Sequence, residues 1–130
     1  MMGRFRIEPT LPASDLERAK AWYREKLGLE PVLETPADVF YVAGGVRFSI
    51  YPSQFAGTAQ NTAAAFVVED VEAVVEELIG RGVVFEQYDL PGVKTDERGI
   101  AQLEGFKGAW FKDSEGNTIV VGQEPELPSA

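Results

Sequence analysis

The chain of 130 residues contains neither cysteine nor histidine. The absence of cysteine excludes disulfides, thiolate metal sites and cysteine nucleophiles. The absence of histidine excludes a Ser-His-Asp triad and removes the imidazole ligand that metal centres most often use. Apolar runs of the roughly 18 residues that a membrane helix needs are also absent, and the N-terminal residues lack the apolar stretch of a signal peptide. We therefore expect a soluble cytoplasmic protein with no membrane partner.

Basic residues are few, since 12 Lys and Arg stand against 21 Asp and Glu and give a net charge of -9. Affinity for nucleic acid comes largely from basic side chains that neutralise phosphates, so no nucleic-acid partner is expected. Hydrophobic residues make up 45% and charged residues 25% of the chain, as in an ordinary globular protein. The length is that of a single domain, which we place at residues 1–130.

One pattern occurs twice. The first copy begins at Ser14-Asp15-Leu16-Glu17 and continues as an amphipathic segment to Gly28, and the second begins at Glu69-Asp70-Val71-Glu72 and continues to Gly82. Such a repeat indicates two copies of one supersecondary unit. The domain is therefore expected to contain two modules, at about residues 1–55 and 60–124.

The first copy has the pattern of a βαβββ unit. Ser14 and Glu17 form a capping box that predicts the start of a helix, and Gly28 predicts its end. Gly44-Gly45 is a strong signal for a two-residue hairpin turn. The expected strands cover residues 5–11, 31–34, 39–43 and 46–51.

The second copy has the same order. Asp70 is the expected N-cap of a helix that ends at Gly80 and Gly82. Residues 89–108 are long and polar, which predicts a mobile loop or a hairpin. The expected strands cover residues 63–68, 83–88, 109–112 and 118–121.

Taken together, these segments resemble the vicinal-oxygen-chelate superfamily, which includes glyoxalase I, bleomycin-resistance proteins and extradiol dioxygenases. The matching pieces are Ser14-Asp15-Leu16-Glu17-Arg18-Ala19, Trp22-Tyr23, Leu27-Gly28 and Asp113-Ser114-Glu115-Gly116-Asn117. The resemblance implies an α+β fold in which two βαβββ modules form an open, cup-shaped sheet. It also implies a ligand in the cup, and its members often pair as dimers.

The metal enzymes of that superfamily hold their ion with four side chains that project into the cup. The resemblance places these positions at Glu8, Ser49, Ala63 (Ala64 if the register slips by one residue) and Val120. A divalent metal needs about four to six donors, which one carboxylate and one hydroxyl do not supply. We therefore predict a member without the metal ligands, with no metal and no cofactor.

Strand alternation then suggests which side chains line the cup. A two-residue Gly44-Gly45 turn pairs Phe40 with Ser49, and on the late strands Trp110 is expected to face the cup while Phe111 packs under the helices. Aromatic walls with a few polar groups suit a small organic ligand, although the same rings could fill a core or a dimer interface. The expected ligand-binding residues are Glu8, Phe40, Arg47, Ser49, Tyr51, Trp110 and Val120, and Val42, Ala63 and Thr118 complete the lining.

Glu8 is the candidate catalytic residue. A carboxylate partly buried among aromatic rings would have a raised pKa and could act as a general base. Glu8 could also pair with a cationic ligand or with Arg47, and a structural ion pair with Arg47 is the preferred reading.

Three functions remain open. The first is a metal-free small-molecule binding protein that resembles the bleomycin-resistance branch and sequesters an aromatic or cationic compound. The second is a metal-free lyase or isomerase that uses Glu8. The third is a metal-dependent glyoxalase-like lyase or dioxygenase. A homodimer is expected, because the segment around Pro9 and Pro12 leaves apolar strand surface near a sheet edge.

Overall fold

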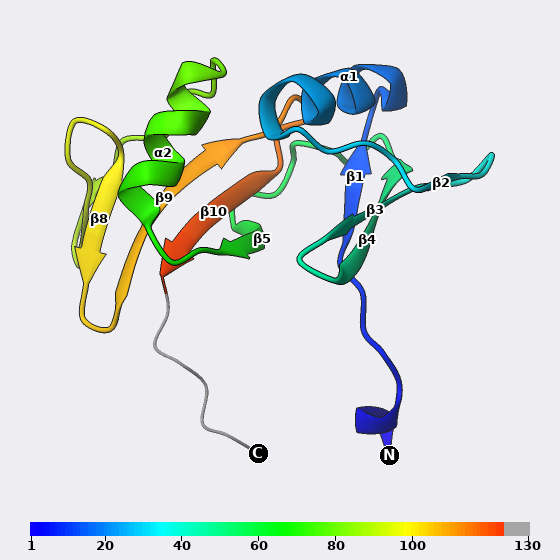
Figure 1. The fold of residues 1–130 in the computed structure, drawn as a ribbon, viewed down its shortest axis with the longest axis horizontal. Coiled ribbons are helices and arrows are strands. Elements are labelled where there is room, and N and C mark those ends of the chain that lie inside the picture. Colours follow the sequence, from blue (N-terminus) through cyan, green and yellow to red (C-terminus); the bar gives the residue numbers. More distant parts are fainter. Residues whose placement is uncertain (124–130) are drawn as a thin grey trace. The chain divides into compact units, whose positions relative to one another are not determined.

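The computed structural model describes residues 1–123, which form two compact units (Figure 1). Unit 1 comprises residues 1–60 and 114–117, and unit 2 comprises residues 61–113 and 118–123. Each unit has its own sheet and its own helix. Within the described part of the chain, no helix is long and apolar enough to cross a membrane.

Unit 1 pairs one helix with a four-stranded mixed sheet. After a short 3-10 turn η1 (Met2–Arg4), its elements are β1 (Thr10–Ala13), α1 (Leu16–Leu27), β2 (Leu33–Glu34), β3 (Val39–Ala43) and β4 (Val46–Pro52). The strand order is β1-β4-β3-β2, with β1 parallel to β4 and the other pairs antiparallel.

Unit 2 repeats this plan. Its elements are β5 (Thr62–Val67), α2 (Val71–Gly80), a small hairpin of β6 (Asp89–Leu90) and β7 (Val93–Lys94), and then β8 (Ile100–Leu103), β9 (Phe106–Lys112) and β10 (Thr118–Gln123). The sheet order is β5-β10-β9-β8, with β5 parallel to β10. Two units with the same strand order confirm the α+β fold class that the resemblance implies.

Both helices begin at an aspartate whose side chain caps the first turn. Asp15, not Ser14, caps α1, because its carboxylate accepts the Arg18 backbone N–H at 3.0 Å. The Ser14 prediction was wrong by one residue, and the Ser14 hydroxyl instead donates to Glu115. At α2 the predicted cap is confirmed, since Asp70 accepts the backbone N–H of Ala73 at 3.1 Å.

Each helix packs on one face of its own sheet. In unit 1 the buried ring of Tyr23 on α1 contacts Tyr41 on β3 and Phe48 on β4, with centroid separations of 5.8 and 6.4 Å. In unit 2 the buried residues Val71 and Val75 of α2 belong to the core that contains Phe111. Burial of these apolar faces supplies most of the driving force for folding.

Two expected strands differ from the structure more than the others do. The strand predicted at residues 5–11 begins only at Thr10, although the Pro9 carbonyl still accepts the Ser49 backbone N–H at 3.1 Å. The strand predicted at residues 83–88 is not formed, because Phe85 makes only an isolated bridge to Phe111. The fourth strand of this sheet is β8, which lies within the segment 89–108 that was expected to be a loop or hairpin and which pairs with β9.

Candidate functional site

Each sheet has a face turned away from its helix, which we call the distal face. In unit 1, Tyr41 and Phe48 occupy the helix side, so alternation places their strand neighbours on the distal face. The predicted register is confirmed, because Phe40 pairs with Ser49 and Val42 with Arg47. The distal face of unit 1 carries Thr10, Phe40, Val42, Arg47, Ser49 and Tyr51.

Glu8 lies at one end of this face in an ion-pair cluster. Arg47 Nε donates to Glu8 Oε1 at 2.8 Å, and Arg6 Nε lies 2.6 Å from Glu8 Oε2. The hydrogen bond from Arg47 lowers the pKa of Glu8, which is the opposite of what a general base near neutral pH requires. The geometry therefore agrees with the preferred reading of Glu8 as a structural ion pair.

The remaining candidates of unit 1 lie on the same face as this cluster. The guanidinium of Arg47 also lies 4.9 Å from the centroid of the Phe40 ring, which is a cation–π distance. Ser49 is buried and Tyr51 is exposed on the same face. The structure thus brings Glu8, Phe40 and Arg47 into contact, with Ser49 and Tyr51 on neighbouring positions of one ladder.

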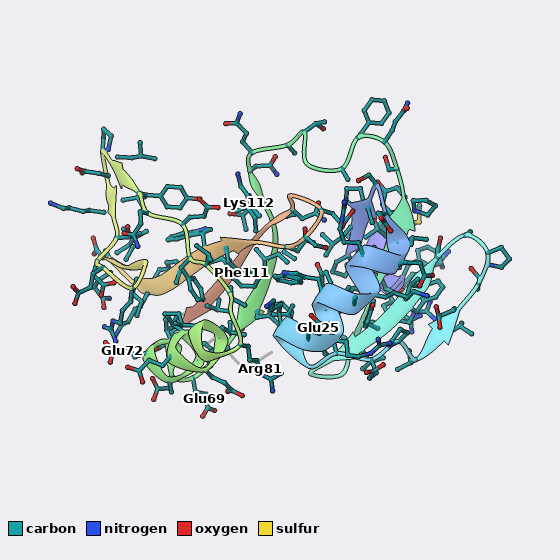
Figure 2. All side chains as sticks on the ribbon, turned by 90° about the horizontal axis from the view of Figure 1, so that it is seen from above. Glu25, Glu69, Glu72, Arg81, Phe111 and Lys112 are labelled. Atoms are coloured by element: carbon teal, nitrogen blue, oxygen red, sulfur yellow. The ribbon has the colours of Figure 1, made fainter. Side chains whose placement is uncertain are left out.

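In unit 2, Trp110 and Val120 pair across β9 and β10 on the distal face. Phe111 is fully buried against Phe85 and lies on the side of α2, as expected from alternation. Figure 2 shows Phe111 and Lys112 as consecutive residues of β9 whose side chains leave opposite sides of the strand. Trp110 and Lys112 therefore share the distal face.

The Trp110 indole crosses the sheet. Its Nε1 donates a 3.2 Å hydrogen bond to Thr62 Oγ1, although Trp110 is on β9 and Thr62 is on β5. Because β10 lies between these two strands, the indole must pass over β10 to reach Thr62. The ring is held in place by a polar contact at its far end.

Two further aromatic residues adjoin Trp110 and were not among the residues expected from the sequence. The ring of Tyr88 meets Trp110 edge to face at a centroid distance of 5.6 Å, and the ring of Phe106 lies 6.0 Å away. Burial raises the pKa of Tyr88, so its phenol stays neutral. We call Tyr88, Phe106 and Trp110 the aromatic cluster of unit 2.

Two glycines accommodate Phe106. A Cβ added to Gly108 would lie 2.6 Å from Phe106 Cζ, and one added to Gly122 would lie 2.6 Å from Phe106 Cε1. The ring therefore rests directly on two backbone segments that carry no side chain. Glycine inside a strand often marks such a close approach, so Gly108 and Gly122 were the signal in the sequence that could have indicated a ring packed here.

The ladder next to the expected fifth-strand position is irregular. The ladder between β5 and β10 shifts between Thr118 and Ile119, so Thr118 pairs with Thr62, Ile119 with Ala64 and Val120 with Ala65. Ala63 is the extra residue of a β-bulge. Val120 therefore pairs with Ala65, two residues beyond Ala63, and a bulge of this kind cannot be predicted from strand alternation alone.

The donor set does not fit a divalent metal. Both oxygens of Glu8 face arginines, and Val120 and its neighbour Ala65 have no side-chain donor. Within residues 1–123, no group of three or more His, Cys, Asp or Glu side chains is placed to hold an ion.

Comparison with solved structures finds the same fold at low sequence identity. A glyoxalase family protein from Enterococcus faecalis matches with a TM-score of 0.70 and 23% identity, covering 95% of this chain and 100% of that one. A lactoylglutathione lyase from Agrobacterium tumefaciens matches with a TM-score of 0.64 and 23% identity, covering 92% of each chain. A bleomycin-binding protein in complex with bleomycin matches with a TM-score of 0.66 and 17% identity, covering 93% and 99%.

Comparison with curated protein sequences gives no match. A family model does match, over residues 6–121, which is most of the chain. This agrees with the resemblance noted in the repeated capping signals and the late Gly-Asn turn. The chain belongs to the Glyoxalase/Bleomycin resistance protein/Dioxygenase superfamily.

Proposed function

We propose that this protein binds a small planar organic molecule without transforming it, and that the distal face of unit 2 supplies the main apolar contact. The observation that carries the proposal is the aromatic cluster, in which Tyr88 and Phe106 adjoin Trp110 at centroid distances of 5.6 and 6.0 Å. Aromatic rings beside a few polar groups are typical of sites for organic ligands. The bleomycin-binding protein of similar fold supports this choice within the superfamily.

Binding is favoured over chemistry because the candidate reactive groups are already engaged. The carboxylate of Glu8 is paired with Arg6 and Arg47, and its pKa is lowered. The alternative considered from the sequence, a glyoxalase-like lyase, isomerase or dioxygenase, would need a free base or a metal ligand set. Neither requirement is supported by the donors at the four superfamily positions.

An aromatic ligand is favoured over a cationic one. Glu8 is the acidic side chain expected to attract a cation, yet two guanidinium groups already neutralise it. A cationic ligand would have to displace an arginine before it could reach the carboxylate. An aromatic ligand could contact the rings of the aromatic cluster without displacing an arginine.

The test is a titration of 2-naphthamide, a neutral planar probe, followed through backbone amide shifts in NMR spectra. Trp110→Ala should weaken binding by roughly 1–3 kcal/mol, because the indole is the central ring of the cluster. Trp22→Phe is the matched control, since it removes the chain's other indole, which is on α1. Thermal melts establish that each variant folds. If folded Trp110→Ala binds the probe as tightly as the wild type, the distal face of unit 2 is not the site.

A further inference from the structure

Thr118 carries a buried hydroxyl that the fold does not use. The residue is only 3% exposed, and within residues 1–123 its Oγ1 has no hydrogen-bond partner. A buried polar atom without a partner costs roughly 1–3 kcal/mol, so such atoms are rare in folded proteins. An unpaired hydroxyl beside a candidate binding face therefore calls for a physical explanation.

Thr118 lies on the distal face of unit 2. It shares this face with Val120, two residues further along β10, and its direct neighbours across the sheet are Thr62 on β5 and Lys112 on β9. The Trp110 indole is hydrogen-bonded to the Thr62 hydroxyl, and this bond places the ring over this part of β10. The orphan hydroxyl is therefore next to the aromatic surface proposed to bind the ligand.

Lys112 adds a positive charge at the same place. It is exposed, and within the described residues no carboxylate lies within ion-pair distance of its ammonium group. Most other basic side chains in this unit differ, since Arg98 and Lys107 both contact Glu72. Lys112 thus offers unused N–H donors directly across the ladder from the unused Thr118 hydroxyl.

We propose that the ligand of this face is a planar aromatic molecule bearing a carboxylate or a similar anionic acceptor, recognised by Thr118 and Lys112. This inference rests on the proposed function and names the ligand class for the same face. The Thr118 hydroxyl and the Lys112 ammonium both donate to the acceptor, while the aromatic cluster contacts the ring. The Trp110 indole has to leave Thr62 for the ligand to reach Thr118.

The experiment compares three probes of matched shape: 2-naphthoate, 2-naphthamide and 2-naphthylmethylammonium. The wild type should bind the carboxylate most tightly and the ammonium least. Lys112→Gln should weaken 2-naphthoate roughly tenfold and leave 2-naphthamide nearly unchanged, because a hydrogen bond to a charged group is the stronger kind. Thr118→Val should weaken both of these probes, roughly two- to tenfold, while Thr118→Ser should retain their binding.

Two controls separate local recognition from general effects. Lys26→Gln removes the same charge from α1 in unit 1, and it should leave 2-naphthoate binding unchanged. The melting temperature of unliganded Thr118→Val should stay the same or rise, because the substitution removes a hydroxyl that has no partner. A clear fall would mean that the hydroxyl is bonded in the free protein, which would overturn the inference.

The outcomes also distinguish this inference from the function on which it rests. If the three probes bind equally and Trp110→Ala weakens all of them, the face binds aromatic molecules but does not select anions. If Lys26→Gln and Lys112→Gln weaken 2-naphthoate equally, net charge explains the effect and the inference fails. If no probe binds the wild type, the proposed function fails and the inference fails with it.

Discussion

Arg18 Nε donates a 2.8 Å hydrogen bond to Oε2 of Glu115, a carboxylate whose side chain is only 1% exposed. The same carboxylate accepts the Asp15 backbone N–H at 3.0 Å and the Ser114 hydroxyl at 2.8 Å. All of these residues belong to unit 1, in which the short segment 114–117 meets the start of α1. A buried acid in the late Gly-Asn turn is thus satisfied by the first turn of the first helix.

This carboxylate should make stability depend on pH. Burial alone would raise the pKa of Glu115, but the hydrogen bonds from Arg18, Ser114 and Asp15 outweigh burial and lower the pKa to about 2 from its ordinary 4.5. Because the folded pKa is below the unfolded one, the stabilisation is complete above pH 4.5 and is lost as pH falls towards 2. Urea unfolding at a series of pH values measures this loss.

The variant Glu115→Gln should unfold more easily at neutral pH, by about 1–3 kcal/mol, and its stability should vary less below pH 4.5. Glu97→Gln is the control, because Glu97 is exposed and the change in net charge is the same. Equal acid sensitivity of Glu115→Gln and the wild type would contradict the role given to this ion pair.

The close approach of Phe106 to two glycines gives a second prediction. Gly108→Ala and Gly122→Ala should each destabilise the protein by roughly 1–3 kcal/mol, because the added methyl would lie 2.6 Å from the ring. Gly80→Ala, where a Cβ meets nothing within 4 Å, should be neutral or stabilising. The double variant Phe106→Leu/Gly108→Ala should cost less than the sum of its parts in chemical denaturation, and simple additivity would speak against the contact.

A third prediction concerns the ion pair of Glu8. Because Arg6 and Arg47 already occupy both carboxylate oxygens, Glu8→Gln should not weaken a cationic probe more than a neutral probe of the same shape. Its melting temperature should fall modestly, because the Glu8 side chain is only 17% exposed, whereas those of Arg6 and Arg47 are 72% and 42% exposed and pairs with exposed partners contribute little. Titrations with 2-naphthylmethylammonium and 2-naphthamide make the comparison. Selective loss of the cation would restore Glu8 as a ligand-binding residue.

The parts of the fold that the sequence predicted well are those fixed by local rules. Gly44 and Gly45 have positive φ values of 57° and 80°, as a two-residue hairpin turn requires, and this turn alone sets the pairing of Phe40 with Ser49. The helix ends were equally local, since Gly28 is left-handed with a φ of 68° and Asp70 caps α2. A short-range steric or hydrogen-bonding rule decides each of these features.

The misjudged parts depend on distant partners. Residues 83–88 alternate in burial, with Val83 and Phe85 buried and Val84 exposed, yet they add no strand to the sheet. Alternation reports which side chains are buried and not whether a backbone ladder forms. The aromatic cluster also depends on distant partners. Tyr88 and Phe106 meet Trp110 from separate segments of the chain, so the local sequence pattern did not predict it.

A fourth prediction is that the protein is a homodimer in solution. Within its own sheet β5 is an edge strand, and Val67 on it is 68% exposed, while Ile7, just before β1, is 91% exposed. Exposed apolar residues at strand edges favour association. Sedimentation at micromolar concentration should show a dimer that Val67→Lys weakens. Val84→Lys is the control, since Val84 is 83% exposed but is outside any strand. A wild-type monomer would contradict the prediction.

The last prediction isolates the hydrogen bond that holds the Trp110 indole across β10. Thr62→Val keeps the shape of the side chain but removes the oxygen that accepts from Nε1 at 3.2 Å. The freed indole should sample positions away from the sheet and become more accessible to water. In a Trp22→Phe background Trp110 is the only tryptophan, so the indole emission reports on this ring alone. Adding Thr62→Val should shift that emission to longer wavelength and increase its quenching by acrylamide.

The direction of the binding effect follows from the same hydrogen bond. If the indole has to leave Thr62 before a ligand reaches Thr118, breaking this contact in advance should strengthen binding of 2-naphthoate or leave it unchanged, and it should not weaken it. Thr58→Val is the matched control, because the Thr58 hydroxyl donates to the Phe55 carbonyl in unit 1 and has no role at this face. Unchanged emission and quenching in Thr62→Val would show that the ring is held by packing against Tyr88 and Phe106 rather than by its contact with Thr62.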